Sequence, residues 1–249
     1  MNNILFIIPH PDDEIVGASI IINRLLKKKN LFFFFLTNGV ISKNQQWYWD
    51  RNGHEKKVKR RNKEMKSSIS HIGFKKFFLQ NIPTRSLKLN IEKTYNKILK
   101  IGKSYKIDTI FCPAYEGGHQ DHDVANFICS RLNVYFSIYE FAEYNFFQKK
   151  INSNKFIKPA KKDIIIELTN EEKKIKRKML NIYLSESNNL NYISLKQESY
   201  RKLINYDYMK PPHQGTLFYR RFSFFDWHPR VDSDSPELIC ICIAESKIF

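Results

Sequence analysis

Two short clusters of imidazole and carboxylate side chains are the residues of this sequence best suited to chemistry. They are His10–Glu14, with the sequence HPDDE, and His119–His122, with the sequence HQDH. A set of histidine and aspartate ligands with an open position is typical of a catalytic zinc site, which keeps about three protein ligands and a water. Zinc lowers the pKa of that water to about 7 and polarises a carbonyl group, and a nearby carboxylate then serves as base. This combination hydrolyses amides.

The spacing inside each cluster suits that chemistry. Asp12 and Asp13 enter the first turn of a predicted helix, where free amides and the helix dipole favour ionised carboxylates. Neighbouring carboxylates on a turn point in different directions, so one can bind a metal while the other faces the attacking water. His119 and His122 are three residues apart and share one face of a helix. Asp121, between them, can hold an imidazole in one tautomer.

The strands that precede the clusters predict where they lie. Residues 3–9 and residues 109–113 are continuous apolar runs, and we expect both to be buried parallel strands. One cluster follows each strand. In open α/β sheets ligands bind beyond the carboxyl ends of the strands, so we expect the two clusters to meet in one crevice.

Up to about Tyr144 the chain alternates strands and helices, and after it the pattern changes. This predicts an α/β class: a Rossmann-like three-layer fold with a mostly parallel central sheet and a C-terminal elaboration. We expect one domain over residues 1–249, with a core in 1–145 that holds both clusters and a part in 146–249 that closes over the site. The expected strands are 3–9, 31–37 (stopped by Asn38-Gly39), 75–79, 109–113, 134–139 and 163–168; the expected helices are 14–28, 55–72, 91–105, 119–132 and 171–184; residues 41–53 are expected to be a loop and 200–230 an extended wall.

Composition limits the other possibilities. The formal charge is +17, but the lysines are scattered beside Asn and Ile, so we interpret the charge as a compositional bias and expect no nucleic-acid partner. Cys240 and Cys242 alternate with isoleucines, which favours a strand, and nothing indicates disulfides, so a reducing cytoplasm is expected. There is no leader pattern, and the longest apolar runs are too short to span a bilayer.

The motifs resemble those of the PIG-L/LmbE family of zinc-dependent N-acetylglucosaminyl deacetylases. The segment ILFIIPHPDDEIVGAS resembles the family's first signature, and PAYEGGHQDHD resembles its second. Weaker similarities are LTNGV, the RRNKEM helix followed by HIGF, and KMLNIYLSES. The resemblance covers about the first 190 residues and implies release of acetate from an amino sugar.

The resemblance also implies roles for individual residues, with one zinc ion per chain. Asp12 would be the general base. Asp121 would orient His119, which would be a charged partner for the oxyanion or the leaving amine. Arg61 would hold the sugar or its anionic substituent. The implied zinc ligands are His10, Asp13 and His122.

Two positions depart from the family pattern. Gln120 stands where the second signature has proline, a position that needs no chemistry. Gly117 stands where some relatives carry a tyrosine as oxyanion donor, and the nearest tyrosine, Tyr115, is interpreted as a packing residue. The oxyanion donor besides zinc and His119 is therefore left open.

Substrate contacts are predicted outside the two clusters. Trp47 and Trp49 follow the second strand and can stack on a sugar ring. His213 lies in a loop and is either a substrate contact or a surface residue. Arginines 220, 221 and 230 can bind the phosphates of a nucleotide- or lipid-linked sugar.

We therefore expect a deacetylase of N-acetylglucosamine-type sugars. The nearest alternative is a zinc amidase that cleaves a larger acyl or thiol-conjugate amide. A basic, non-catalytic binding module for carbohydrate or nucleic acid on the same fold is a further alternative, and a two-metal phosphoesterase would need more ligands than these.

Overall fold

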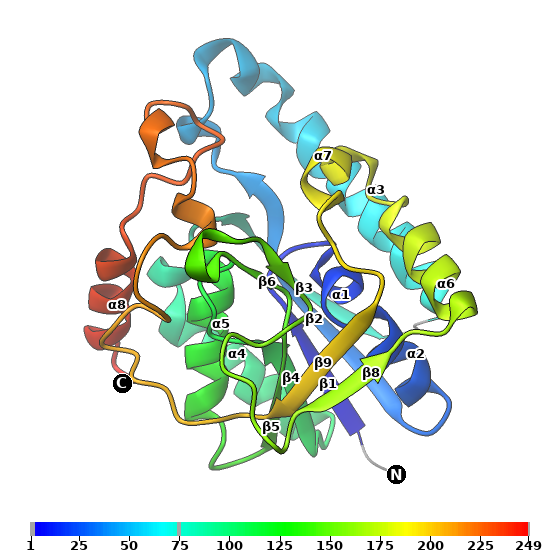
Figure 1. Ribbon diagram of the computed structural model, residues 1–249. Coiled ribbons are helices and arrows are strands. Elements are labelled where there is room, and N and C mark those ends of the chain that lie inside the picture. The colour runs from blue at the N-terminus through cyan, green and yellow to red at the C-terminus, as the bar shows by residue number, and fades with distance from the viewer. Residues whose placement is uncertain (1–2, 74–75, 249) are drawn as a thin grey trace.

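The computed structural model describes residues 3–73 and 76–248, and its centre is a sheet with the strand order β3-β2-β1-β4-β5-β9-β8 (Figure 1). The strands from β1 to β5 are parallel, and β9 and β8 extend the sheet in antiparallel fashion beyond β5. The strands of the sheet are β1 (Asn3–Ile8), β2 (Asn30–Ile41), β3 (Phe77–Thr84), β4 (Thr109–Pro113), β5 (Ser137–Phe141), β8 (Ile164–Glu167) and β9 (Gln197–Lys202). The predicted α/β fold class with a mostly parallel sheet is confirmed.

Helices cover both faces of the sheet and make three layers (Figure 1). One face carries α1 (Asp13–Val16), α2 (Ser19–Leu26), α3 (His54–Ile72) and α6 (Asn170–Leu180); the other carries α4 (Ile91–Ser104), α5 (Gln120–Arg131) and α8 (Pro236–Ala244). Shorter elements are α7 (Ser187–Leu190), β6 (Tyr144–Asn145), β7 (Asn152–Ser153) and the 3-10 helices η1 (Lys43–Gln45), η2 (Tyr48–Gly53), η3 (Leu87–Leu89), η4 (Phe147–Lys149), η5 (Leu184–Glu186), η6 (Phe218–Arg220) and η7 (Ser223–Phe225).

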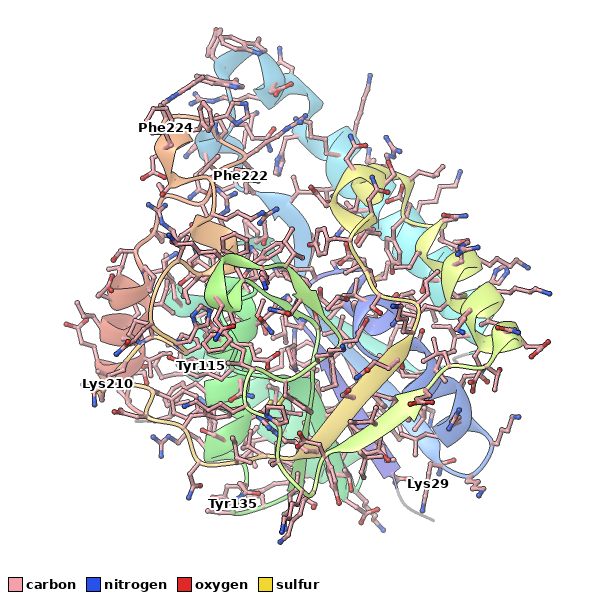
Figure 2. All side chains as sticks on the ribbon, in the orientation of Figure 1. Lys29, Tyr115, Tyr135, Lys210, Phe222 and Phe224 are labelled. Atoms are coloured by element: carbon pink, nitrogen blue, oxygen red, sulfur yellow. The ribbon has the colours of Figure 1, made fainter. Side chains whose placement is uncertain are left out.

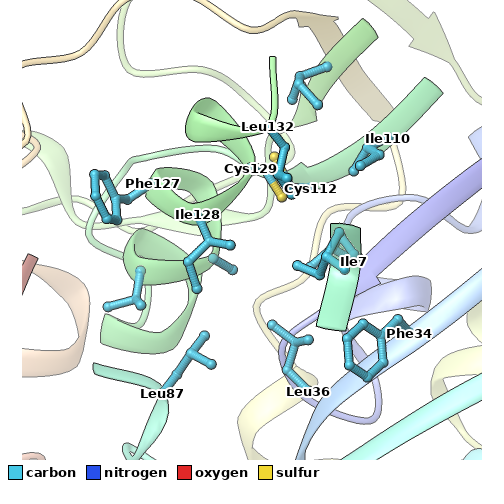
Figure 3. Close-up of a cluster of buried hydrophobic side chains, with 14 of the residues drawn as sticks. Ile7, Phe34, Leu36, Leu87, Ile110, Cys112, Phe127, Ile128, Cys129 and Leu132 are labelled. Atoms are coloured by element: carbon cyan, nitrogen blue, oxygen red, sulfur yellow. The ribbon is translucent and has the colours of Figure 1, made fainter. Parts of the chain in front are cut away.

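The central strands are apolar on both faces because both faces are covered. In β1, Leu5 and Ile7 pack toward α4 and α5, and Phe6 packs in the other layer. Figure 3 shows the first of these clusters, in which Ile128 of α5 lies between Phe127 and Ile7 of the sheet. Such burial on both sides explains why the strands are continuous apolar runs instead of alternating ones.

Several element boundaries differ from those expected. β2 does not stop at Asn38-Gly39 but continues to Ile41 with shifts of register against β3. The predicted helix 14–28 is divided into α1 and α2 around Gly17, where a Cβ atom would lie 2.4 Å from the Phe141 ring. Residues 41–53 contain η1 and η2, and residues 200–202 complete β9. Lys75, the expected start of the third strand, lies outside the described residues.

The segment with Cys240 and Cys242 is a helix, not a strand. Ser235 accepts a hydrogen bond from the backbone N–H of Leu238, and Pro236 occupies the first turn, so α8 has a strong start signal. That signal outweighs the alternation of isoleucine and cysteine. In residues 3–73 and 76–248, no helix combines the length and the apolar character needed to cross a bilayer.

Candidate active site

The two clusters meet because β1 and β4 are neighbours. Ile4 pairs with Thr109 and Phe6 with Phe111 in parallel register, so both strands end at the same edge of the sheet. The chain runs outward from β1 to β2 and β3 on one side and from β4 to β5 on the other. The crevice at this switch point holds His10–Asp13 and His119–His122, as the position of such sites in open α/β sheets predicts.

Three buried side chains aim their ligand atoms at one point. Nδ1 of His10 lies 3.1 Å from Oδ2 of Asp13 and 3.1 Å from Nε2 of His122. The same Asp13 oxygen lies 3.2 Å from Nε2 of His122. Nitrogen and oxygen ligands of a tetrahedral zinc ion lie about 3.3 Å from one another. The spacing and the donor set therefore fit a divalent cation of this kind.

The charge of the site also suits a cation. Burial alone would lower the pKa of His10, but Asp13 and Asp121 raise it to about 10. In the protein without metal, the imidazole itself thus carries the positive charge that the surrounding carboxylates attract. A divalent cation can take over this charge and leave His10 as a neutral ligand.

The imidazoles of His10 and His122 each have a carboxylate next to the ring nitrogen that does not face the proposed metal position. Oδ2 of Asp121 accepts a hydrogen bond from Nε2 of His10 at 3.0 Å, whereas it lies 3.7 Å from Nδ1 of His119. Oε2 of Glu143 lies 3.4 Å from Nδ1 of His122. Such pairs fix which ring nitrogen faces the metal. We expected Asp121 to orient His119, but its closer partner is His10.

Asp12 is buried, and its backbone conformation is strained. Its φ of 124° is unusual for a residue with a side chain. Glu14 stabilises this turn: its carboxylate accepts hydrogen bonds from the Asp12 amide at 3.0 Å and from the Ser68 and Tyr183 hydroxyls. Burial raises the pKa of the Asp12 carboxyl well above its ordinary value, and the charge of Arg61 acts in the opposite direction.

Arg61 lines the cavity, but its charge is directed at Asp12. The side chain comes from α3, is 3% exposed, and donates to the Pro11 carbonyl and, at 3.2 Å, to Oδ2 of Asp12. Its other terminal nitrogen donates to the Ser185 hydroxyl. The structure thus places Arg61 against the carboxylate beside the metal ligands, and its contact with a sugar stays a prediction.

His119 begins α5 and caps it. Its Nδ1 accepts a hydrogen bond from the Asp121 amide at 3.0 Å, so the proton of a neutral ring is on Nε2. Burial and the nearby His10 lower the pKa of His119 well below its ordinary value. In this structure His119 is thus placed to donate through Nε2, and its role as a charged partner of the oxyanion or the leaving amine stays a prediction.

A cavity of about 1010 Å³ opens beside these residues. Its walls are aromatic on one side, with Tyr144, Tyr192 and Phe218, and cationic toward the mouth, where Arg221 and Arg230 lie. This volume is at the upper end of the range of about 300–1,000 Å³ that is usual for small-molecule sites.

The predicted substrate contacts have different positions. Trp47 lines the cavity; Trp49 stacks on Trp47 at 5.1 Å, is 72% exposed, and is not among the described residues of the lining. His213 is also outside that lining, and its Nδ1 contacts the Gln214 carbonyl. Tyr115 is a buried packing residue whose hydroxyl donates to the Lys210 carbonyl.

Two residues of the site were not predicted. Glu143 follows β5, and applying the strand-end rule to this strand as well would have identified it. Gln120, expected to have no role, is fully buried; its amide donates to Asp232 at 2.7 Å and to Asp234 at 2.8 Å. It therefore attaches the C-terminal segment to the second cluster.

The fold and the site define a class of α/β hydrolases whose metal-binding residues lie at the switch point of a parallel sheet. The family model described as GlcNAc-PI de-N-acetylase matches residues 5–133, so the chain belongs to the PIG-L family and is a sugar N-deacetylase. No curated protein sequence matches the chain.

Solved structures share the fold. A deacetylase of teicoplanin biosynthesis is 12% identical with a TM-score of 0.64, over 83% of this chain and 99% of that chain. The N,N'-diacetylchitobiose deacetylase of Pyrococcus horikoshii is 20% identical with a TM-score of 0.58, over 81% and 84%. The 4-carboxy-2-hydroxymuconate hydratase of Pseudomonas putida is 10% identical with a TM-score of 0.54, over 83% and 98%. The hydratase demonstrates that this fold alone does not determine the reaction.

Proposed function

We propose that the chain removes the N-acetyl group from an N-acetylglucosamine-type sugar or sugar conjugate, with one zinc ion held by His10, Asp13 and His122. The observation that carries this proposal is the triangle of ligand atoms at 3.1–3.2 Å beside the buried, strained carboxylate of Asp12. An electrophilic metal next to a poised base is the arrangement that amide hydrolysis needs.

The bound metal supplies Lewis-acid chemistry: it polarises the acetyl carbonyl and makes a water more acidic. Asp12 takes a proton from the water whose oxygen bonds to the carbonyl carbon. The Nε2–H of His119 donates to the developing oxyanion. Asp12 then returns the proton to the amine nitrogen as the C–N bond breaks, which releases acetate and a free amino sugar. Arg61 holds the Asp12 carboxylate, while Asp121 and Glu143 hold the two imidazoles.

The cavity walls suggest how the sugar is held. Trp47 offers an aromatic face to a sugar ring. Arg221 and Arg230 at the mouth suit the phosphates of a nucleotide or lipid carrier. We assign the closing of the cavity to the part of the domain in residues 146–249, which contributes Tyr192 and Phe218 to the walls. Trp49 and His213 lie outside the lining, and we give them no direct contact.

An acetate-release screen tests this proposal. The purified chain would be supplied with N-acetylglucosamine, diacetylchitobiose and a nucleotide-linked N-acetylglucosamine, each with and without a chelator. We expect release that the chelator abolishes and added zinc restores. Glucosamine amides with longer acyl chains form a second series, and faster cleavage of these would replace acetyl by a larger acyl group. Release that is unaffected by metal removal would overturn the proposal.

A further inference from the structure

Seven aromatic side chains gather beside the cavity, and all of them except the half-buried Trp47 are exposed to solvent. They come from two segments that are far apart in the sequence, η2 with the residue before it and residues 222–227. Five of the rings form a connected series: Phe225 contacts Phe224 at 5.4 Å and Trp227 at 6.4 Å, Trp227 contacts Trp47 at 6.1 Å, and Trp47 stacks on Trp49. We call this surface the aromatic rim; it comprises Trp47, Tyr48, Trp49, Phe222, Phe224, Phe225 and Trp227.

The rim is exposed to an extent unusual for such large rings. Phe224 is 89% exposed, Tyr48 80%, Trp49 72% and Trp227 67%. Figure 2 shows Phe222 and Phe224 together at one end of the molecule, far from Tyr135 at the opposite end. Contiguous exposed apolar surface on this scale marks a contact with a partner rather than ordinary surface.

Hydrogen bonds attach the segment that follows the rim to the rest of the protein. The Arg85 guanidinium donates to the carbonyls of Pro229, Arg230 and Val231, at 3.1, 2.9 and 3.0 Å. Gln120 binds Asp232 and Asp234 immediately after them. The rings of residues 222–227 are therefore presented on a segment attached to the site.

Positive charge accompanies the rings. Residues 43–60 carry six Lys and Arg against Asp50 and Glu55, and residues 220–230 carry three arginines against Asp226. Asp226 is paired with Arg220 at 2.8 Å, and Asp50 lies 3.6 Å from Lys57. The unbalanced charge of both segments is positive, so the complementary partner is anionic.

From the exposed rings and their basic flanks we propose that the aromatic rim docks the cavity mouth onto an anionic lipid bilayer. Trp, Tyr and Phe rings bury favourably at the boundary between headgroups and acyl chains, and nearby Lys and Arg are attracted by anionic headgroups. A second copy of the rim would bring like charges together. A single-stranded nucleic acid would need free ring faces along a groove, whereas Trp47 and Trp49 stack on each other at 5.1 Å.

The tryptophans make a direct measurement possible, because all three in the chain belong to the rim. The full chain would be titrated with vesicles of phosphatidylcholine alone and with vesicles that also contain phosphatidylglycerol. We expect a blue shift of the tryptophan emission and cosedimentation with the anionic vesicles, both weakened by salt. Equal binding to neutral and anionic vesicles, or none to either, would overturn the proposal.

Matched variants distinguish the rim from the general positive charge. Phe224→Ser with Phe225→Ser removes two exposed rings outside the cavity lining, and we expect affinity for anionic vesicles to fall about tenfold or more. Val134→Ser with Tyr135→Ser, at the opposite end, is the control and should bind like the unaltered chain. Equal binding by the two double variants would contradict the rim as the docking surface.

Two further readouts separate this inference from other outcomes. Acetate release from a soluble sugar tests the proposed function without lipid, so a chain can fail either test alone. Sedimentation velocity tests whether a second copy of the chain covers the rim, and binding of a single-stranded oligonucleotide tests whether a nucleic acid does. Self-association that is lost in the Phe224/Phe225 variant, or binding of the oligonucleotide in preference to anionic vesicles, would overturn the lipid proposal.

Discussion

Oε2 of Glu143 lies 3.4 Å from Nδ1 of His122, on the side of the ring opposite to the nitrogen that faces Asp13. Neither Glu143 oxygen has a hydrogen-bond partner among the described residues, and the side chain is buried. The carboxylate is therefore available to this imidazole, as Asp121 is to His10 at 3.0 Å.

Replacing Glu143 by glutamine is expected to weaken zinc binding about tenfold, because carboxylates behind metal-binding histidines raise the basicity of the ring and fix its orientation. Competition with a chromophoric chelator measures the affinity. Asp121→Asn should produce a loss of similar size on the His10 side. An unchanged zinc affinity in Glu143→Gln would show that Glu143 does not position His122.

Asp12→Ala is expected to retain the metal and to lower the rate of acetate release about a hundredfold to ten-thousandfold, the usual contribution of a positioned base. His122→Ala is the comparison and should lose both metal and activity. Metal content by atomic absorption and initial rates separate the two. Near-full turnover by a zinc-loaded Asp12→Ala chain would refute the assignment of the base.

Arg61→Met is expected to move the acidic limb of the pH profile of kcat/KM to higher pH. Burial raises the pKa of Asp12, and the positive charge of Arg61 lowers it. Without that charge the pKa of Asp12 rises further, so the ionised base forms only at higher pH. Arg60→Met, whose guanidinium contacts Glu64 instead, is the control. A higher KM for anionic substrates with an unshifted limb would restore the direct contact between Arg61 and the sugar.

Gln120→Ala is expected to lower the free energy of unfolding by about 1–3 kcal/mol, since Oδ2 of the buried Asp232 loses its hydrogen-bond donor while Oδ1 keeps the Asp234 amide. Urea denaturation measures this change. The same variant should be cleaved faster by proteases between residues 222 and 231, because that segment loses one of its attachments. Protection equal to that of the unaltered chain would mean that Arg85 alone holds it.

Most of the fold could be predicted because periodicity and strand-end rules act locally. The apolar runs of β1 and β4 and the polar clusters after them were sufficient to bring His10 and His122 together. The contact of Asp121 with His10 could not be predicted, because it depends on the orientation of the first turn of α5 relative to the end of β1. Glu143 was missed although it follows β5, to which the strand-end rule also applies. Its closeness to Gly17, where a Cβ atom would lie 2.7 Å from Cγ of Glu143, depends on tertiary packing that no local pattern shows.

The errors lie where context outweighs local pattern. Alternation at Cys240 and Cys242 predicted a strand, yet the Ser235-Pro236 start signal and packing against α5 make a helix. Trp49 and His213 were assigned to the site from loop position alone, and a loop's position does not determine which of its side chains point inward.

Strands β2 and β3 and helices α1 to α4 lie between β1 and β4 in the sequence, so His122 is the last of the three ligands to be synthesised. His10 and Asp13 are three residues apart, whereas His10 and His122 are 112 residues apart. A chain in which β4 has not yet joined the sheet offers a cation only two ligands, His10 and Asp13, and these bind it weakly. Zinc would thus bind the completed sheet and not partly folded chains. It would therefore stabilise the native topology once this has formed, and it would not direct the folding.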